Sequence, residues 1–191
     1  MVREVLRNAL ESPVSSKISP SSETRFRLAF EAARNGGLRD AARVLTWQEF
    51  EKFAEECLAA TGFQTTRGLM VTGETRRWQI DLVAMRGPMM LVFDCKHWNS
   101  PSYPSKFESA AEHQRLATMA LIRNSKARES FAGKQVWALP IILTLFDPRI
   151  QLTNGVVLLS IDKLADFLNG VTHYSDLPFI SDGNVAENPI R

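Results

Sequence analysis

The chain has 191 residues, of which 45% are hydrophobic and 23% charged, and its formal net charge is +2. These proportions are typical of a soluble globular protein that can bury one substantial core. The longest apolar run, 136–146, is shorter than the roughly 20 residues of a membrane-spanning helix. The first eleven residues also lack the apolar segment of a signal peptide, and the two cysteines suggest no disulfide framework. We therefore expect a cytoplasmic protein that does not contact a membrane.

Residues 1–45 are predicted to be a helical appendage to the main domain. A short helix is expected over 1–11, and residues 12–22 are rich in Ser and Pro, which is typical of a connector. Apolar residues at helical spacing predict a further helix over 23–34, ended by two glycines. This section could pack on the core, bind DNA or mediate dimerisation, and the sequence leaves these three roles open.

A helix is predicted to begin after Thr46, because Thr46 and Glu49 have the spacing of a capping box. Glu51 lies at the margin of its apolar stripe. Since Glu49 already has a role as the cap partner, Glu51 is the better candidate for an active site. The alternative is that Glu51 is a solvated carboxylate on the helix surface.

The stretch 78–98 predicts two buried strands joined by a short turn at 86–88, after a short strand at 63–66 and a loop. Asp81 lies in the first of these two strands, and Asp94 and Lys96 lie in the second. Side chains two residues apart in a strand point to the same face. Because burying charges is costly, such a group indicates either a metal site or a structural ion pair.

The rest of the chain predicts a helix over 105–126, strands over 136–146 and 155–160, a helix over 161–168 and an irregular tail over 171–191. Pro140 in the third long strand predicts a bulge or an edge position. Gln114 is the one large polar residue on the inner face of the 105–126 helix. It either orients water or a phosphate at the site or caps a buried backbone group. The order of elements predicts an α/β/α sandwich around a mixed sheet.

Basic residues are concentrated outside the C-terminal part of the chain. The first 146 residues carry 20 bases and 15 acids, a net charge of +5, and Arg67, Arg76 and Arg77 precede the Asp81 strand. Basic groups near an acidic site suit a polyanion such as nucleic acid. For any single arginine, a solvated surface position is the favoured explanation.

Three short motifs, in this order, resemble the PD-(D/E)xK nuclease superfamily, and within it the Mrr-like restriction endonucleases and archaeal Holliday-junction resolvases. The motifs are Phe50-Glu51, Trp78-Gln79-Ile80-Asp81 and Phe93-Asp94-Cys95-Lys96. The resemblance covers residues 46–170 and implies a restriction-endonuclease-like α/β/α sandwich. The chain departs from Mrr-like proteins in two places. It has no glycine shortly before Asp81, and it has Asp94 where Glu or Gln is more frequent.

The resemblance implies a site for Mg²⁺, with Mn²⁺ as a substitute. Its ligands would be the carboxylates of Asp81 and Asp94 and the backbone carbonyl of Cys95, and Glu51 would hold either a metal-bound water or a second ion. Lys96 would orient or activate the attacking water. Together with Gln114, these side chains form the expected catalytic group. The hard Mg²⁺ ion prefers such oxygen ligands.

The implied activity is hydrolysis of DNA phosphodiester bonds, in restriction or in repair, on duplex or branched DNA. The sequence leaves the oligomeric state open, with a homodimer as one alternative, since double-strand cleavage by single-site nucleases often needs two copies. A second hypothesis is a nucleic-acid-binding or assembly module that keeps the fold without turnover. A third is an α/β domain whose buried charges form a structural network.

Overall fold

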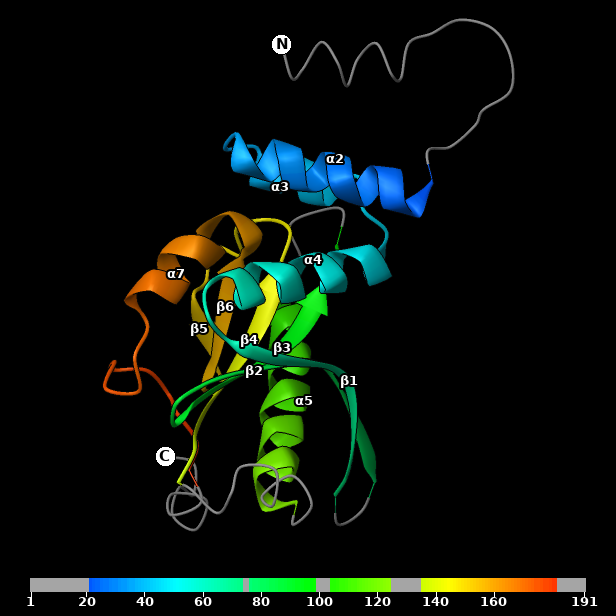
Figure 1. Cartoon of the computed structure of the whole chain (residues 1–191). Helices are drawn as coiled ribbons and strands as arrows, with labels where there is room; N and C mark the ends of the chain where they lie inside the picture. The colour runs from blue at the N-terminus through cyan, green and yellow to red at the C-terminus, as the bar shows by residue number, and fades with distance from the viewer. Residues whose placement is uncertain (1–20, 74–75, 99–103, 125–134, 182–191) are drawn as a thin grey trace, which may run out of the picture.

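The computed structural model describes residues 21–73, 76–98, 104–124 and 135–181 (Figure 1). The helix expected over 1–11 and most of the Ser/Pro-rich connector lie outside these residues. The strands are β1 (Gln64–Thr72), β2 (Arg77–Arg86), β3 (Met89–Lys96), β4 (Trp137–Thr144), β5 (Leu152–Thr153) and β6 (Val156–Ser160). The helices are α2 (Ser22–Arg34), α3 (Leu38–Arg43), α4 (Trp47–Ala60), α5 (Pro104–Arg123) and α7 (Leu164–Gly170), with a 3₁₀ turn, η1 (Ile161–Lys163).

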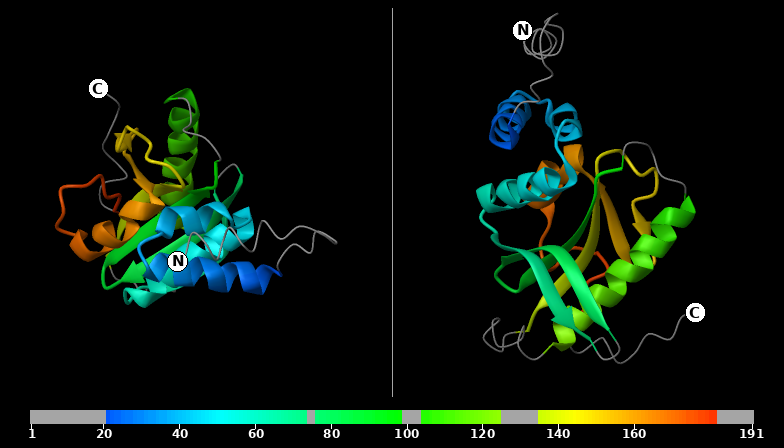
Figure 2. Two further views of the ribbon diagram at one scale, coloured as in Figure 1. Left: turned by 90° about the horizontal axis from the view of Figure 1, so that it is seen from above. Right: turned by 90° about the vertical axis from the view of Figure 1, so that its right-hand side faces the viewer.

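The strands form one mixed sheet in the order β1-β2-β3-β4-β6-β5. The predicted hairpin of β2 and β3 is antiparallel, whereas β3, β4 and β6 are parallel. In Figure 2, α5 lies against one face of the sheet, and α4 lies on the opposite face. The helices α2, α3 and α7 share the core on the α4 side. The predicted α/β/α sandwich with a central mixed sheet is therefore confirmed.

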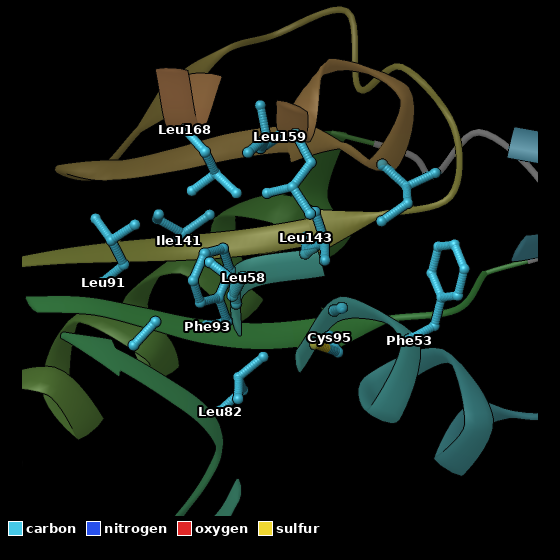
Figure 3. Packing of buried hydrophobic residues seen from close by; sticks show 14 of the residues in the cluster. Phe53, Leu58, Leu82, Leu91, Phe93, Cys95, Ile141, Leu143, Leu159 and Leu168 are labelled. Carbon is cyan, nitrogen blue, oxygen red and sulfur yellow. The ribbon is translucent and has the colours of Figure 1, made fainter. Parts of the chain in front are cut away.

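Strand β3 supplies buried side chains to both layers of the core. Leu91, Phe93 and Cys95 pack on the α4 side, as Figure 3 shows. Met90 and Val92, which alternate with them, pack against α5. This two-sided burial explains the continuous apolar sequence of the strand. At about 25 cal/mol per Å² of apolar surface, each large side chain contributes about 1.5–3 kcal/mol to folding.

The N-terminal helices pack on the core, which is one of the three roles left open by the sequence. Ala29 and Ala32 of α2 and Ala41 and Ala42 of α3 are buried in the α4-side cluster. The short helix α3 and the two-residue strand β5 were not predicted. Among the described residues, no helix is long and apolar enough to cross a membrane.

Two strand predictions need correction. Strand β1 extends over nine residues to Thr72, so Gly68 lies inside a strand and not in a loop. Strand β4 has β3 on one side and β6 on the other, so Pro140 does not lie at the edge of the sheet. Its missing N–H is tolerated because the pairing of β4 with β6 begins only at Ile141.

The hairpin of β1 and β2 changes direction in its middle. Gly68, with a φ of +66°, lies between the pairs Arg67↔Leu82 and Leu69↔Ile80. On one side of this point Leu82 packs in the α4-side cluster, and on the other side Ile80 packs in the α5-side cluster. A left-handed residue inside a strand sharpens its local twist. The bend places Asp81 at the point where the hairpin turns.

Candidate active site

Asp81 lies where β2 separates from β3. The pairing of these strands ends at Leu82↔Phe93. One residue further, Oδ2 of Asp81 accepts a hydrogen bond of 2.9 Å from the backbone N–H of Cys95. In an extended strand the N–H and C=O of one residue point to the same side. The carbonyl of Cys95 therefore faces the same gap as the Asp81 carboxylate.

Asp94 and Lys96 form an ion pair at the end of β3. The Nζ atom of Lys96 lies 2.8 Å from Oδ1 of Asp94. The second oxygen, Oδ2 of Asp94, is buried and has no hydrogen-bond partner within the described part of the chain. A buried carboxylate oxygen without a partner is costly, so a ligand at this position would relieve the cost.

Glu51 approaches the same group from α4. Its side chain is buried at 8% exposure, and Oε1 has no hydrogen-bond partner among the described residues. Burial above all, together with the negative charges of Asp81 and Asp94, raises the pKa of Glu51 to about 7, although Arg67 and Lys96 act in the opposite direction. The structure therefore brings Glu51 together with the three charged residues of the hairpin.

The surroundings of Asp81 also shift the pKa of its carboxyl group. Burial above all, together with the neighbouring Asp94 carboxylate, raises the pKa of Asp81 to about 6, although the hydrogen bond from the Cys95 N–H and the charge of Lys96 lower it. Three carboxyl groups thus share a buried site with one lysine. The raised pKa values of Glu51 and Asp81 show that this site disfavours their ionised forms, an effect that a bound cation would counteract.

Glu49 is engaged elsewhere, as the capping box predicts. Its Oε2 accepts from the Thr46 N–H at 2.8 Å, and its Oε1 lies 2.8 Å from Nη2 of Arg25 in α2. Although burial alone would raise the pKa of Glu49, the hydrogen bonds from Arg25, Ser22 and Thr46 lower it to about 2. Glu49 therefore links α2 to the start of α4 and leaves Glu51 as the candidate site residue.

Gln114 makes the backbone contact that was one of its two predicted roles. Its Nε2 donates to the carbonyl of Val92 at 2.7 Å, and the residue is 2% exposed. It does not belong to the lining of the groove beside Asp94. We therefore reassign Gln114 from the catalytic group to the support of β3.

An open groove of about 520 Å³ leads to the ion pair. Asp94 and Lys96 form one wall, and the first turns of α5 form the other, with Ser105, Ser109 and His113. The groove gives a ligand access to the C-terminal end of β3, on the face of the sheet that α5 covers.

Two histidines lie near the site and have different surroundings. The Nε2 atom of His97 lies 3.0 Å from the carbonyl oxygen of Ala42, so His97 ties the end of β3 to α3. The ring of His113 contacts Trp78 with ring centroids 5.1 Å apart, and it lines the groove. The sequence analysis missed His113; its spacing of four residues from Ser109 on one helix face is the signal that could have found it.

The donor set fits a hard divalent cation. Within the described residues, no three side chains of His, Cys, Asp or Glu converge closely enough to hold a metal by themselves. In the described part of the chain, one carboxylate oxygen each of Glu51 and Asp94 has no partner, and nearby the Asp81 carboxylate and the Cys95 carbonyl face one gap. Mg²⁺ binds through one or two carboxylates and keeps several waters, so this arrangement suits it.

Comparison with known families agrees with the resemblance seen in the sequence. Residues 42–136 match the model of the Mrr-type catalytic domain, described as a restriction endonuclease. An uncharacterised protein of Archaeoglobus fulgidus is 28% identical over 131 residues, which cover 68% of this chain and 95% of that protein.

Similar solved structures are more distant. A protein of unknown function, AF1548, has 19% identity and a TM-score of 0.39, and the match covers 69% of this chain and 61% of that one. The small subunit of the heterodimeric restriction endonuclease R.BspD6I has 8% identity and a TM-score of 0.39, over 77% and 76% of the two chains. VC1899 from Vibrio cholerae has 12% identity and a TM-score of 0.37, over 88% and 52%.

Proposed function

We propose that the chain is a metal-dependent DNA endonuclease, because residues 42–136 match the Mrr-type catalytic-domain model described as a restriction endonuclease. It hydrolyses phosphodiester bonds at the site formed by Glu51, Asp81, Asp94 and Lys96. One observation carries this proposal. Two buried carboxylate oxygens, from α4 and β3, have no hydrogen-bond partner among the residues that the structure describes, and they lie in one charged cluster beside an accessible lysine.

Glu51, Asp81, Asp94 and the Cys95 carbonyl would hold Mg²⁺, or Mn²⁺ in its place. When bound, the ion would supply Lewis-acid stabilisation of the charge that develops on the scissile phosphate. The positive charge of the ion also compensates the clustered carboxylates, which would otherwise repel one another.

Lys96 acts on the phosphate from the wall of the groove. Its ion pair with Asp94 fixes the direction of the side chain, which is 32% exposed toward solvent. An ammonium group held in this way stabilises developing negative charge and orients the attacking water. The ion pair that the sequence suggested as a purely structural alternative thus positions the lysine.

The substrate is DNA, duplex or branched, and sequence or structure preference is set outside the cluster. A domain with one such site cuts one strand at a time, so cleavage of both strands would need two copies. We therefore propose that a homodimer forms on substrates that receive double-strand cuts.

The test is incubation of the full chain with supercoiled plasmid, linear duplex and a four-way junction, in Mg²⁺ or in EDTA. Nicking or cutting that requires Mg²⁺ is expected, with Mn²⁺ supporting the same products. Stable binding of these substrates without any cleavage would instead identify a nucleic-acid-binding module. If the chain neither binds nor cleaves these substrates, the charged cluster has a structural role alone. This result and binding without cleavage both contradict the proposal.

A further inference from the structure

Three polar side chains form a straight row along the first turns of α5. Ser105, Ser109 and His113 follow each other at intervals of four residues, are exposed, and line the groove. Residues four apart lie on one helix face, with about 6 Å between them along the axis. This interval is comparable to the spacing of successive phosphates along a nucleic-acid strand. We call these three residues the α5 row.

The opposite wall of the groove contains the proposed active site. Asp94 and Lys96 line the same cavity as the α5 row. Of the described residues that line the groove, Asp94 is the one acidic side chain. The α5 row therefore presents hydroxyl and imidazole groups, which suit the acceptor oxygens of phosphates.

Cations lie at both ends of the α5 row. Lys106 lines the groove next to Ser105. At the other end, the guanidinium of Arg76 lies 3.7 Å from the centre of the Trp78 ring, which also contacts His113. Burial, followed by the charges of Arg76 and Lys96, lowers the pKa of His113. A neutral imidazole keeps one N–H donor at pH 7.

We propose that the α5 row binds the backbone of one nucleic-acid strand, running along α5 between Lys106 and Arg76. This inference rests on the proposed function and adds to it the direction of the strand and its phosphate contacts. Neutral donors hold successive phosphates beside Lys96, and the two cations supply the salt-dependent part of the affinity. Contacts of this kind are independent of base sequence.

Contacts of phosphates with cations weaken as the salt concentration rises, whereas contacts with neutral donors do not, so a salt series separates the two kinds. Binding of a fluorescent oligonucleotide, single-stranded or duplex, is measured by anisotropy for the full chain in EDTA, over a series of salt concentrations. The slope of log K against log salt is negative. Each lost phosphate–cation contact reduces its magnitude by about 0.9 for duplex and about 0.7 for a single strand. Lost neutral contacts weaken binding without changing this slope.

We expect K106Q and R76Q each to reduce the magnitude of this slope by the amount that corresponds to one phosphate–cation contact. A double variant, S105A with S109A, and the ring-preserving H113F should weaken binding about two- to tenfold per lost donor, with the slope unchanged. R34Q is the matched control, because Arg34 is an exposed cation on α2, on the other face of the sheet. It should leave both affinity and slope unchanged.

The outcomes separate this inference from the proposed function. If the wild type nicks plasmid in Mg²⁺ but K106Q, R76Q and the row variants all bind as it does, the strand path is wrong and the nuclease assignment stands. If the wild type binds neither form of the oligonucleotide and cuts no plasmid, both fail. Neutral-donor variants that change the salt slope as much as the cation variants would also overturn the proposed division of contacts.

Discussion

Gly68 lies opposite Asp81 in the β1–β2 hairpin, at the one position inside this described ladder where the two strands do not pair. Its φ of +66° is in the left-handed region, and an added Cβ would meet no atom within 4 Å. The requirement for glycine is therefore conformational and not steric. This backbone conformation accompanies the bend that brings the Asp81 carboxylate to the N–H of Cys95.

Gly68→Ala should lower the free energy of unfolding by about 1–2 kcal/mol, the usual cost of a left-handed non-glycine residue. Plasmid nicking should fall more than stability does, because the bend sets the position of Asp81. Urea unfolding and a nicking assay at a temperature where the variant is folded measure the two effects. Gly170→Ala is the control, since Gly170 has no such φ and open space around it. Equal stability of wild type and Gly68→Ala would show that the bend does not depend on this residue.

The sequence predicted the parts of the site that depend on local rules. The capping box of Thr46 and Glu49 separated Glu49 from Glu51, and the alternation of β3 placed Asp94 and Lys96 on one face. The position of Gly68 inside β1 was missed because a glycine after the polar run 64–67 is equally typical of a loop.

The roles of Gln114 and His113 depended on tertiary contacts. Both residues lie on α5, and the group that each side chain contacts decides whether it supports the core or lines the groove. Gln114 meets the carbonyl of Val92 inside the core, and His113 meets Trp78 at the groove. Periodicity identifies the face on which a residue lies, but it does not identify the group that lies opposite.

Metal-free protein should become less stable as the pH rises, because Glu51 and Asp81 are carboxyl groups whose pKa values are raised on folding. The pKa of Glu51 rises from 4.5 to about 7, so between these values the folded state binds more protons than the unfolded state. The stability that this group contributes is full below pH 4.5 and is lost as the pH rises through about 7. Urea unfolding in EDTA at several pH values measures this slope.

Glu51→Gln should remove part of that slope. Above pH 7 the free energy of unfolding of the variant should exceed that of the wild type by about 1–3 kcal/mol, the usual cost of an unsatisfied buried polar group. Glu56→Gln, at an exposed position of the same helix, should leave the pH profile unchanged. A Glu51→Gln protein that is less stable than the wild type above pH 7 would show that the Glu51 charge is compensated inside the protein.

In Mg²⁺ the wild type should be more stable than Glu51→Gln, the reverse of their order in EDTA. An ion that binds only the folded state adds about 2.7 kcal/mol when it is present at about 100 times its Kd. We expect Mg²⁺ to raise the Tm of the wild type and to raise those of Glu51→Gln and Asp94→Asn much less. Calorimetry with Mg²⁺ and with EDTA measures the shift. Equal shifts in all three proteins would place the bound ion elsewhere.

Gln114→Met should act on stability and not on chemistry. The substitution removes the donor to the buried Val92 carbonyl, with an expected loss of about 1–3 kcal/mol. The nicking rate should stay within a few-fold of the wild type where the variant is fully folded. A stable Gln114→Met protein that has lost cleavage would return Gln114 to the catalytic group.

The site assignment depends above all on the nicking rate of three matched proteins in Mg²⁺: the wild type, Asp94→Asn and Asp166→Asn. Asp94 is buried in the charged cluster, whereas Asp166 is an exposed carboxylate on α7. Loss of one transition-state contact at a site of this kind typically slows a reaction by about 10²–10³-fold. We predict a loss of at least this size for Asp94→Asn, and an unchanged rate for Asp166→Asn. Nicking by Asp94→Asn at the wild-type rate would contradict a nuclease centre at this position.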